Sequence, residues 1–283
     1  MRSRNVTARE ALARVVIALE PYAAQVVFIG GWVHAFFLAD AGTREEAIRT
    51  DDIDLTLPPR LLTEGRPRLV ELAVGAGFAV DPLSDLDGAP VRLTIPGPGD
   101  SPIDLDFITE ARRAGAAVAI YGQDGLRAQG YPWQTIALEN ATWVSVGPEI
   151  HELLDPPRKI RVPTISAYVL LKGLSSSTRT RLDKRAKDVV YSHEVLRHPI
   201  LGPLALKGLP DLAARYPIAY AEWRSQLARV TSDFRLLREV AGQLLAADRA
   251  RGDPETVVAA VTARLRRTLA EAPTPGNRAD DPG

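Results

Sequence analysis

The sequence predicts an α+β first half followed by an all-α second half, and three observations carry this expectation. Short apolar strands bounded by Gly and Pro alternate with helical stretches as far as Pro156. After Asp155-Pro156-Pro157, the apolar residues recur with helical spacing. The charge also changes sign there, because residues 1–156 hold 13 Lys and Arg against 22 Asp and Glu, whereas 157–272 hold 21 against 11. We therefore expect domains at 1–156 and 157–271 and a disordered tail at 272–283.

Composition narrows the classes of function. The chain has 283 residues, of which 46% are hydrophobic and 25% charged, an ordinary globular balance. It contains no cysteine, which excludes disulfides, thiolate nucleophiles and zinc-thiolate sites, and its four histidines are scattered. No apolar run is long enough to cross a bilayer, and no signal-peptide core follows the first arginines, so we expect a cytoplasmic protein without a membrane partner. A bound metal would need oxygen ligands.

The first elements form a helix, a strand, a turn and a second helix. Thr7 and Glu10 form a capping-box pattern at the start of an apolar helical stripe that Pro21 ends. Residues 26–29 then predict a buried strand, Gly30-Gly31 a turn and 32–38 an apolar helix. A charged loop at 41–50 leads to the next strand.

Two later strands carry paired aspartates. In residues 52–57, alternation sends the apolar side chains to the core and Asp52 and Asp54 to the other face, while Asp51 turns away from them. After a Gly- and Pro-rich turn at 96–100, the same pattern places Asp104 and Asp106 together. Further elements are expected as a helix at 61–76 and strands at 91–95 and 141–146.

The second half holds one buried lysine within a basic segment. We expect helices at 164–174, 178–196, around 204–214, at 219–247 and at 254–271. Lys172 lies in an apolar helix and requires a partner, for which Asp188 is available. Helical spacing places Arg185 on the same face as Asp188. The pair is either a structural ion pair or a phosphate-binding lysine that Asp188 positions.

Carboxylates aligned on one strand face repel each other. Two unit charges about 5 Å apart interact by on the order of 3 kcal/mol at an effective dielectric constant of about 20. Mg²⁺ or Mn²⁺ would offset this repulsion, because hard cations prefer carboxylate, water and phosphate oxygens. Taken alone, Gly30-Gly31 could be an ordinary tight turn, and Asp52 and Asp54 a solvated strand face. Together with a second Asp-x-Asp strand they favour a site for a metal-bound triphosphate.

These motifs resemble the DNA polymerase beta superfamily of nucleotidyltransferases. The matching segments are Phe28-Ile-Gly-Gly31, Asp52-Ile-Asp54 and Pro102-Ile-Asp-Leu-Asp106. The resemblance implies a mixed sheet with helices, in which Asp52 and Asp54 hold the metals. It also implies that Gly30 and Gly31 approach the NTP, and that Asp104 or Asp106 acts as base or third metal ligand. Asp104 is favoured as the catalytic residue, and Asp106 stays a candidate metal ligand.

The helical half resembles nucleotidyltransferase toxins of the AbiEii/MenT type. Lys172 and Arg185-Ala-Lys187-Asp188 match in order and spacing, which implies that Lys172, Arg185 and Asp188 complete the site. The implied activity is transfer of NMP from an NTP to RNA, with tRNA as the acceptor and an antitoxin protein as a partner if the protein is a toxin. Trp32 stands where the toxins commonly have a hydroxyl residue. Gly-Gly-Trp looks more like aminoglycoside-type, small-molecule transferases, so the acceptor stays open. A catalytically silent binding module is a third hypothesis.

Other conspicuous residues favour structural roles. We expect His34 to pack within its helix, and Trp133, Trp143 and Trp223 to lie in the core rather than serve as stacking platforms. Residues 175–177, three serines, mark a helix end rather than a nucleophile, since no general base is placed near them.

Overall fold

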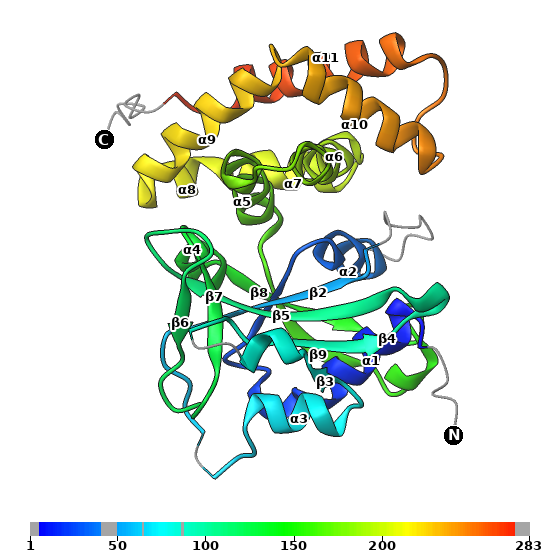
Figure 1. Cartoon of the computed structure of the whole chain (residues 1–283). Coiled ribbons are helices and arrows are strands. Elements are labelled where there is room, and N and C mark those ends of the chain that lie inside the picture. The colour runs from blue at the N-terminus through cyan, green and yellow to red at the C-terminus, as the bar shows by residue number, and fades with distance from the viewer. Residues whose placement is uncertain (1–5, 41–49, 64, 86–87, 275–283) are drawn as a thin grey trace. The chain divides into compact units, whose positions relative to one another are not determined.

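The protein is an α+β chain with a mixed sheet and a helical second part, as expected (Figure 1). The computed structural model describes residues 6–40, 50–63, 65–85 and 88–274. The chain forms two compact units, Met1–Pro163 and Thr164–Gly283. This division falls one strand later than the boundary expected at residue 156. The reason is that β9 (Arg158–Pro163) pairs with β8 (Ala141–Val146) and so belongs to the first unit.

One seven-stranded sheet organises the first unit. Its strands are β1 (Val27–Ile29), β2 (Asp52–Leu57), β3 (Ala79–Val80), β4 (Arg92–Pro96), β5 (Pro102–Glu110), β6 (Ala117–Ala119) and β7 (Arg127–Tyr131). The main order is β1-β2-β5-β4-β3, and β7 pairs with both β5 and β6. β2 and β5 run parallel, whereas β1 and β4 are antiparallel to their neighbours β2 and β5. The two aspartate strands are therefore direct neighbours.

Helices cover this sheet on both sides. They are α1 (Ala8–Ala18), α2 (Trp32–Asp40), α3 (Leu69–Gly75) and α4 (Gln134–Glu139), with 3₁₀ turns η1 (Glu20–Tyr22), η2 (Pro82–Asp85), η3 (Pro98–Asp100) and η4 (Glu152–Leu154). Figure 1 shows α1 and α3 on one side of the sheet and α2 and α4 on the other. The charged loop expected at 41–50 lies, apart from Thr50, outside the described residues.

Helix starts follow local capping chemistry. Thr7 caps α1 by accepting from the backbone N–H of Glu10 at 3.1 Å, as expected, but the Glu10 carboxylate binds Arg14 rather than closing a capping box. The helix expected at 61–76 is shorter than predicted and begins only at Leu69. Its start lies after Pro67, where the Glu71 carboxylate accepts from the Arg68 N–H at 3.0 Å.

The alternation predicted for the aspartate strands is confirmed. Ile53, Leu55, Leu105 and Phe107 are at most 1% exposed and belong to the core. The aspartates between them are only partly buried. One face of these strands is thus apolar and the other carries the carboxylates.

The second unit is entirely helical in the part that the structure describes. Its helices are α5 (Ile165–Thr178), α6 (Leu182–Arg197), α7 (Leu201–Lys207), α8 (Leu209–Arg215), α9 (Pro217–Val230), α10 (Phe234–Ala246) and α11 (Pro254–Glu271). The single helix expected at 219–247 is two helices, because Asp233 caps α10 by accepting from the Leu236 N–H at 3.0 Å. Trp223 is fully buried, as expected.

The start of the expected tail is packed. Arg224 donates to the carbonyls of Ala272 and Pro273, and the Tyr220 hydroxyl donates to Pro273 at 3.0 Å. Residues 275–283 lie outside the described part. Among the described helices, none is both long enough and apolar enough to cross a membrane.

Candidate active site

Four carboxylates share one face of the sheet. In the parallel ladder of β2 and β5, Asp52 lies opposite Asp104, and Asp54 lies opposite Asp106. Residues opposite each other in a ladder point to the same face, and so do residues two apart on one strand. The structure thus brings together all four aspartates singled out in the first unit.

Arg92 of β4 is a site residue that the sequence interpretation missed. It lies opposite Asp106 in the antiparallel ladder, and its Nε donates to Asp106 Oδ1 at 3.1 Å. Its Nη1 is 4.0 Å from Asp104 Oδ2. A signal was available, because the alternation of buried Val91, Leu93 and an exposed residue at position 92 places Arg92 on the carboxylate face.

The pKa of Asp104 lies above its ordinary value, and burial is the main cause. Burial raises the pKa of Asp104, and the negative charges of Asp106 and Asp52 raise it further against the opposing effect of Arg92. Conversely, Asp106 is the main cause of the raised pKa of Arg92. A carboxylate with a raised pKa holds a proton more readily and gains from an added cation.

The glycine turn packs directly against the carboxylates. Gly30 has φ +77°, a conformation that residues with a side chain rarely adopt. A Cβ atom at Gly30 would also overlap Asp54 Oδ2. Gly31 follows as a buried residue just before α2. Glycine at position 30 therefore permits both the turn and the close approach of Asp54 to the backbone.

The donor set fits a cation that is shared with a phosphate ligand. In the described ranges, no group of three or more His, Asp or Glu residues is arranged to hold a metal ion by itself. Mg²⁺ commonly takes one or two carboxylates, several waters and substrate phosphate oxygens, so it does not need such a group. Asp52, Asp54 and Asp104 offer hard oxygen donors. Asp106, also an expected metal ligand, accepts a hydrogen bond from Arg92 through Oδ1.

Trp32 and His34 are both buried in α2. Trp32 is 7% exposed and stacks on Phe36, with 6.5 Å between the ring centroids. Its Nε1 is buried and finds no acceptor within the part of the chain described by the structure. His34 is 2% exposed, which confirms its expected packing. The first residue of α2 thus carries a buried N–H donor.

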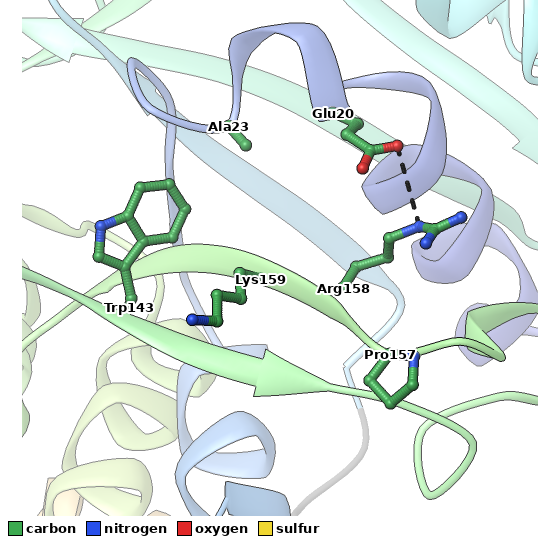
Figure 2. A pocket seen from close by; sticks show the side chains of 6 residues that line it. All are labelled: Glu20, Ala23, Trp143, Pro157, Arg158 and Lys159. Carbon is green, nitrogen blue, oxygen red and sulfur yellow. Dashed lines mark ion pairs between the residues drawn. The ribbon is translucent and has the colours of Figure 1, made fainter.

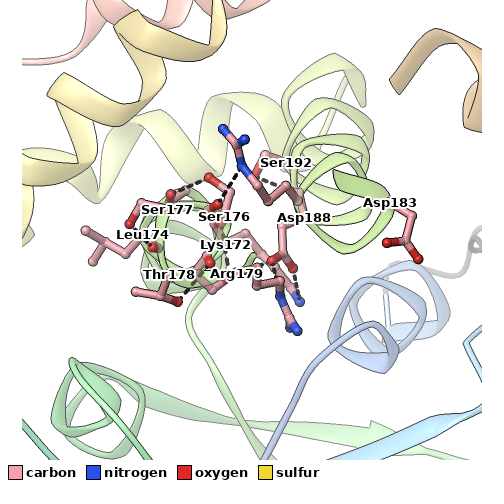
Figure 3. Close-up of polar contacts among 12 residues, drawn as sticks. Lys172, Leu174, Ser176, Ser177, Thr178, Arg179, Asp183, Asp188 and Ser192 are labelled. Atoms are coloured by element: carbon pink, nitrogen blue, oxygen red, sulfur yellow. Dashed lines mark hydrogen bonds and ion pairs between the residues drawn. The ribbon is translucent and has the colours of Figure 1, made fainter. Parts of the chain in front are cut away.

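The second unit holds a separate charge cluster around Asp188 (Figure 3). Lys172 Nζ lies 3.1 Å from Asp188 Oδ1, and Arg179 Nε lies 2.7 Å from Oδ2. The Ser175 hydroxyl also donates to Oδ2 at 2.9 Å. The pairing considered for Lys172 and Asp188 is therefore present in the structure. Arg179 and Ser175 are additional members, and Ser175 could have been found from its i+3 spacing to Lys172 on the same helix.

The charges of this cluster are well compensated. Burial alone would raise the pKa of Asp188, but Lys172 and Arg179 outweigh it and lower that pKa. Lys172 also lies 4.9 Å from the ring centroid of Tyr191. Arg185 does not join the cluster, because it donates to the Ser176 carbonyl at 3.2 Å and pairs with Asp233 at 3.5 Å. The expected grouping of Arg185 with Asp188 is thus replaced by contacts to α5 and to the cap of α10.

Comparison with protein-family models and with curated protein sequences finds no match to this chain.

Proposed function

We propose that the protein is a metal-dependent nucleotidyltransferase that moves NMP from an NTP to a hydroxyl of RNA. One observation carries the proposal. The parallel register joins Asp52 and Asp54 to Asp104 on one face, and the Gly30 turn lies against Asp54. The resemblance to toxins of the AbiEii/MenT type further favours tRNA as the acceptor and an antitoxin as the partner.

The chemistry requires a base and a place for the triphosphate. The acceptor oxygen attacks the α-phosphorus, the bond between the α-phosphorus and the bridging oxygen breaks, and pyrophosphate leaves. Asp104 suits acceptance of the hydroxyl proton, because it lies opposite Asp52 in the ladder, beside the residues that would hold the cation. Mg²⁺, when bound, would neutralise the negative charge that builds up on the phosphate oxygens.

The remaining residues of the first unit would orient these groups. Asp52 and Asp54 would hold the cation from β2. The turn at Gly30 and Gly31 leads into α2, whose first backbone N–H groups suit phosphate oxygens. Arg92 would keep Asp106 in a fixed position through its 3.1 Å contact. The resemblance assigns Lys172 and Asp188 to the same reaction, with Lys172 as a phosphate ligand.

Transfer of label from α-labelled NTPs to total RNA in the presence of Mg²⁺ tests the proposal. Asp54→Asn should lower transfer by at least about a hundredfold, because it removes a charged cation ligand. Asp51→Asn is the matched control, since Asp51 is exposed and lies before β2. Equal activity in wild type and Asp54→Asn would contradict the assignment. Absence of Mg²⁺-dependent NTP binding in calorimetry would favour a silent binding module.

An aminoglycoside-type transferase is a second candidate, and the acidity of the first unit favours it. Four aspartates against Arg92 on one face would attract a cationic amino sugar. The same labelled-NTP assay distinguishes the two candidates. Label on an aminoglycoside and none on RNA would establish the small-molecule activity and exclude the RNA transferase.

A further inference from the structure

A cavity of about 510 Å³ lies in the first unit, outside the carboxylate face (Figure 2). It is lined by Glu20, Ala23, Trp143, Pro157, Arg158 and Lys159. Its wall at Ala23 precedes β1, whereas the glycine turn follows the other end of that strand. The cavity is therefore at the opposite end of β1 from Gly30 and is not part of the site at the glycine turn.

Trp143 contradicts the expectation that it belongs to the core. It is 49% exposed, whereas its neighbour Val144 is 3% exposed and Val146 fully buried. Alternation along β8 thus buries the valines and turns Trp143 outward. The expectation that Trp143 is buried considered only its residue type. Its position in the alternation of β8 instead predicts that it lies on the solvent-facing side. A large aromatic ring is consequently available at the cavity.

Two cations accompany this ring. In the ladder of β8 and β9, Trp143 lies opposite Arg161, and Ser145 lies opposite Lys159, so Lys159 is a diagonal neighbour of Trp143 on the same face. Arg158 lies on the other side of the cavity, where its Nε is 3.8 Å from a Glu20 carboxylate oxygen. That Nε is buried and has no hydrogen-bond partner among the residues described. The cavity therefore offers an aromatic face and an ammonium, while the guanidinium of Arg158 is paired with Glu20.

Arg161 holds the surroundings of the cavity in place. Its guanidinium donates to the carbonyl of Ala24 at 2.9 Å and to that of Leu138 at 3.1 Å. Burial lowers the pKa of Arg161. These contacts join β9 to the segment that carries Ala23, so the wall of the cavity is fixed before any ligand binds.

We propose that this cavity binds one nucleotide of a single-stranded RNA. The base stacks on Trp143, and the adjacent phosphate contacts Lys159. Glu20 accepts from an amino group of the base, which keeps the phosphate on the lysine side. A base must leave its stack to reach Trp143, which favours a single strand over a duplex. The choice of RNA as the source of this nucleotide rests on the proposed function.

Binding of a short fluorescein-labelled oligoadenylate, followed by anisotropy without metal or NTP, tests the site. Trp143→Ala should weaken binding by roughly tenfold, as expected for loss of one base stack. Trp143→Phe should retain most of the affinity because it keeps an aromatic face. Tyr121→Ala is the matched control, since Tyr121 is 67% exposed in the same unit and lies outside the cavity. Wild-type affinity of Trp143→Ala, or equal loss in both Trp143 variants, would overturn the proposal.

Salt dependence tests the phosphate contact. Lys159→Ala should weaken binding and lower the slope of log affinity against log salt by roughly 0.7, the value for one phosphate of a single strand. Arg113→Ala is the control, because Arg113 is exposed and outside the cavity. AMP should displace the oligonucleotide only weakly, and displacement at equal concentration would make a free nucleotide the ligand. Because binding needs no transfer, an Asp54→Asn chain that still binds RNA separates this site from catalysis.

Discussion

Asp104 and Asp188 are both partly or fully removed from water, but their surroundings move their pKa in opposite directions. The pKa of Asp104 is raised by burial and, to a smaller extent, by Asp106 and Asp52 on the same face. Asp188 has Lys172 and Arg179 within 3.1 Å, and its pKa is lowered although it is fully buried. The first site has carboxylates that gain from a cation, whereas the second already contains its cations.

This difference predicts that the two clusters respond differently to an added ion. A ligand cation at the carboxylate face would relieve repulsion, so the protein gains by binding it. A phosphate that took Lys172 away from Asp188 would leave a buried carboxylate with one cation fewer. If Lys172 serves the transferase reaction, it must therefore do so while it remains bound to Asp188.

The largest expected effect is on stability, at Asp188. Asp188→Ala should lower the free energy of unfolding of the second unit by about 3–5 kcal/mol, because it leaves Lys172 buried without its carboxylate. Urea unfolding followed by circular dichroism measures the change. Asp183→Ala is the control, since Asp183 belongs to the same helix, its side chain is 45% exposed, and it pairs with Arg181. If Asp188→Ala lowered the free energy of unfolding by less than about 1 kcal/mol, Asp188 would not support the fold as proposed, and the contrast with Asp104 would fail.

The opposite outcome is expected at Asp104. Asp104→Asn removes a charge that lies among other carboxylates, so unfolding free energy should stay within about 1 kcal/mol of wild type or rise. Transfer activity should nevertheless fall by at least about a hundredfold, because Asn cannot accept the proton. A large loss of stability together with retained activity would show that Asp104 supports the fold rather than the reaction.

The two regions also differ in how far the sequence predicted them. The alternation in β2 and β5 depends only on neighbours two residues apart, and it correctly placed Asp52 with Asp54 and Asp104 with Asp106. The pairing of the two strands then joins both pairs on one face. The partner of Asp106 was missed because pairing with Arg92 depends on strand order, which local pattern does not specify. Sequence spacing alone could not identify which cations reach a carboxylate.

In the helical unit too, spacing along the sequence did not identify which charged residues pair with each other. Spacing along α6 suggested that Arg185 accompanies Asp188, but the guanidinium that reaches Asp188 comes from Arg179, beyond the end of α5. The partner of Arg185 is Asp233, whose role as the cap of α10 also divides the expected helix. Local chemistry, a Ser-Asp pair before an apolar run, could have revealed that cap.

A third expected effect concerns acid sensitivity, which should be greater in the helical unit. Burial, with Arg197 and Arg264 nearby, lowers the pKa of His193 to about 4 from its ordinary 6.5. The neutral form therefore stabilises the fold above pH 6.5, and this contribution is lost as pH falls toward 4. Asp188, with its lowered pKa, loses its contribution at still lower pH. The contribution of Asp104 to stability depends on pH in the opposite direction. Because its pKa is raised, it stabilises the fold below about pH 3.8, and this contribution is lost as pH rises.

Unfolding at pH 7 and pH 5 measures this effect. The second unit should lose about 2 kcal/mol between these values through His193. His193→Gln does not titrate in this range and should remove most of the loss. An unchanged pH profile in that variant would assign the acid sensitivity to another group and weaken the contrast between the units.

The smallest effect is expected for substitutions of Arg92. Their effect on Mn²⁺ affinity tests whether the carboxylate face binds a cation. Arg92 is 47% exposed in its side chain, so Arg92→Gln should change unfolding free energy by no more than about 1 kcal/mol. It should, however, strengthen Mn²⁺ binding about fivefold, because it removes a positive charge about 3 to 4 Å from Asp106 and Asp104. Arg92→Lys keeps the charge and should bind Mn²⁺ like the wild type. Electron paramagnetic resonance of Mn²⁺ measures affinity without any turnover, so equal affinity in all three chains would place the cation away from these carboxylates even if the protein proved to be a transferase.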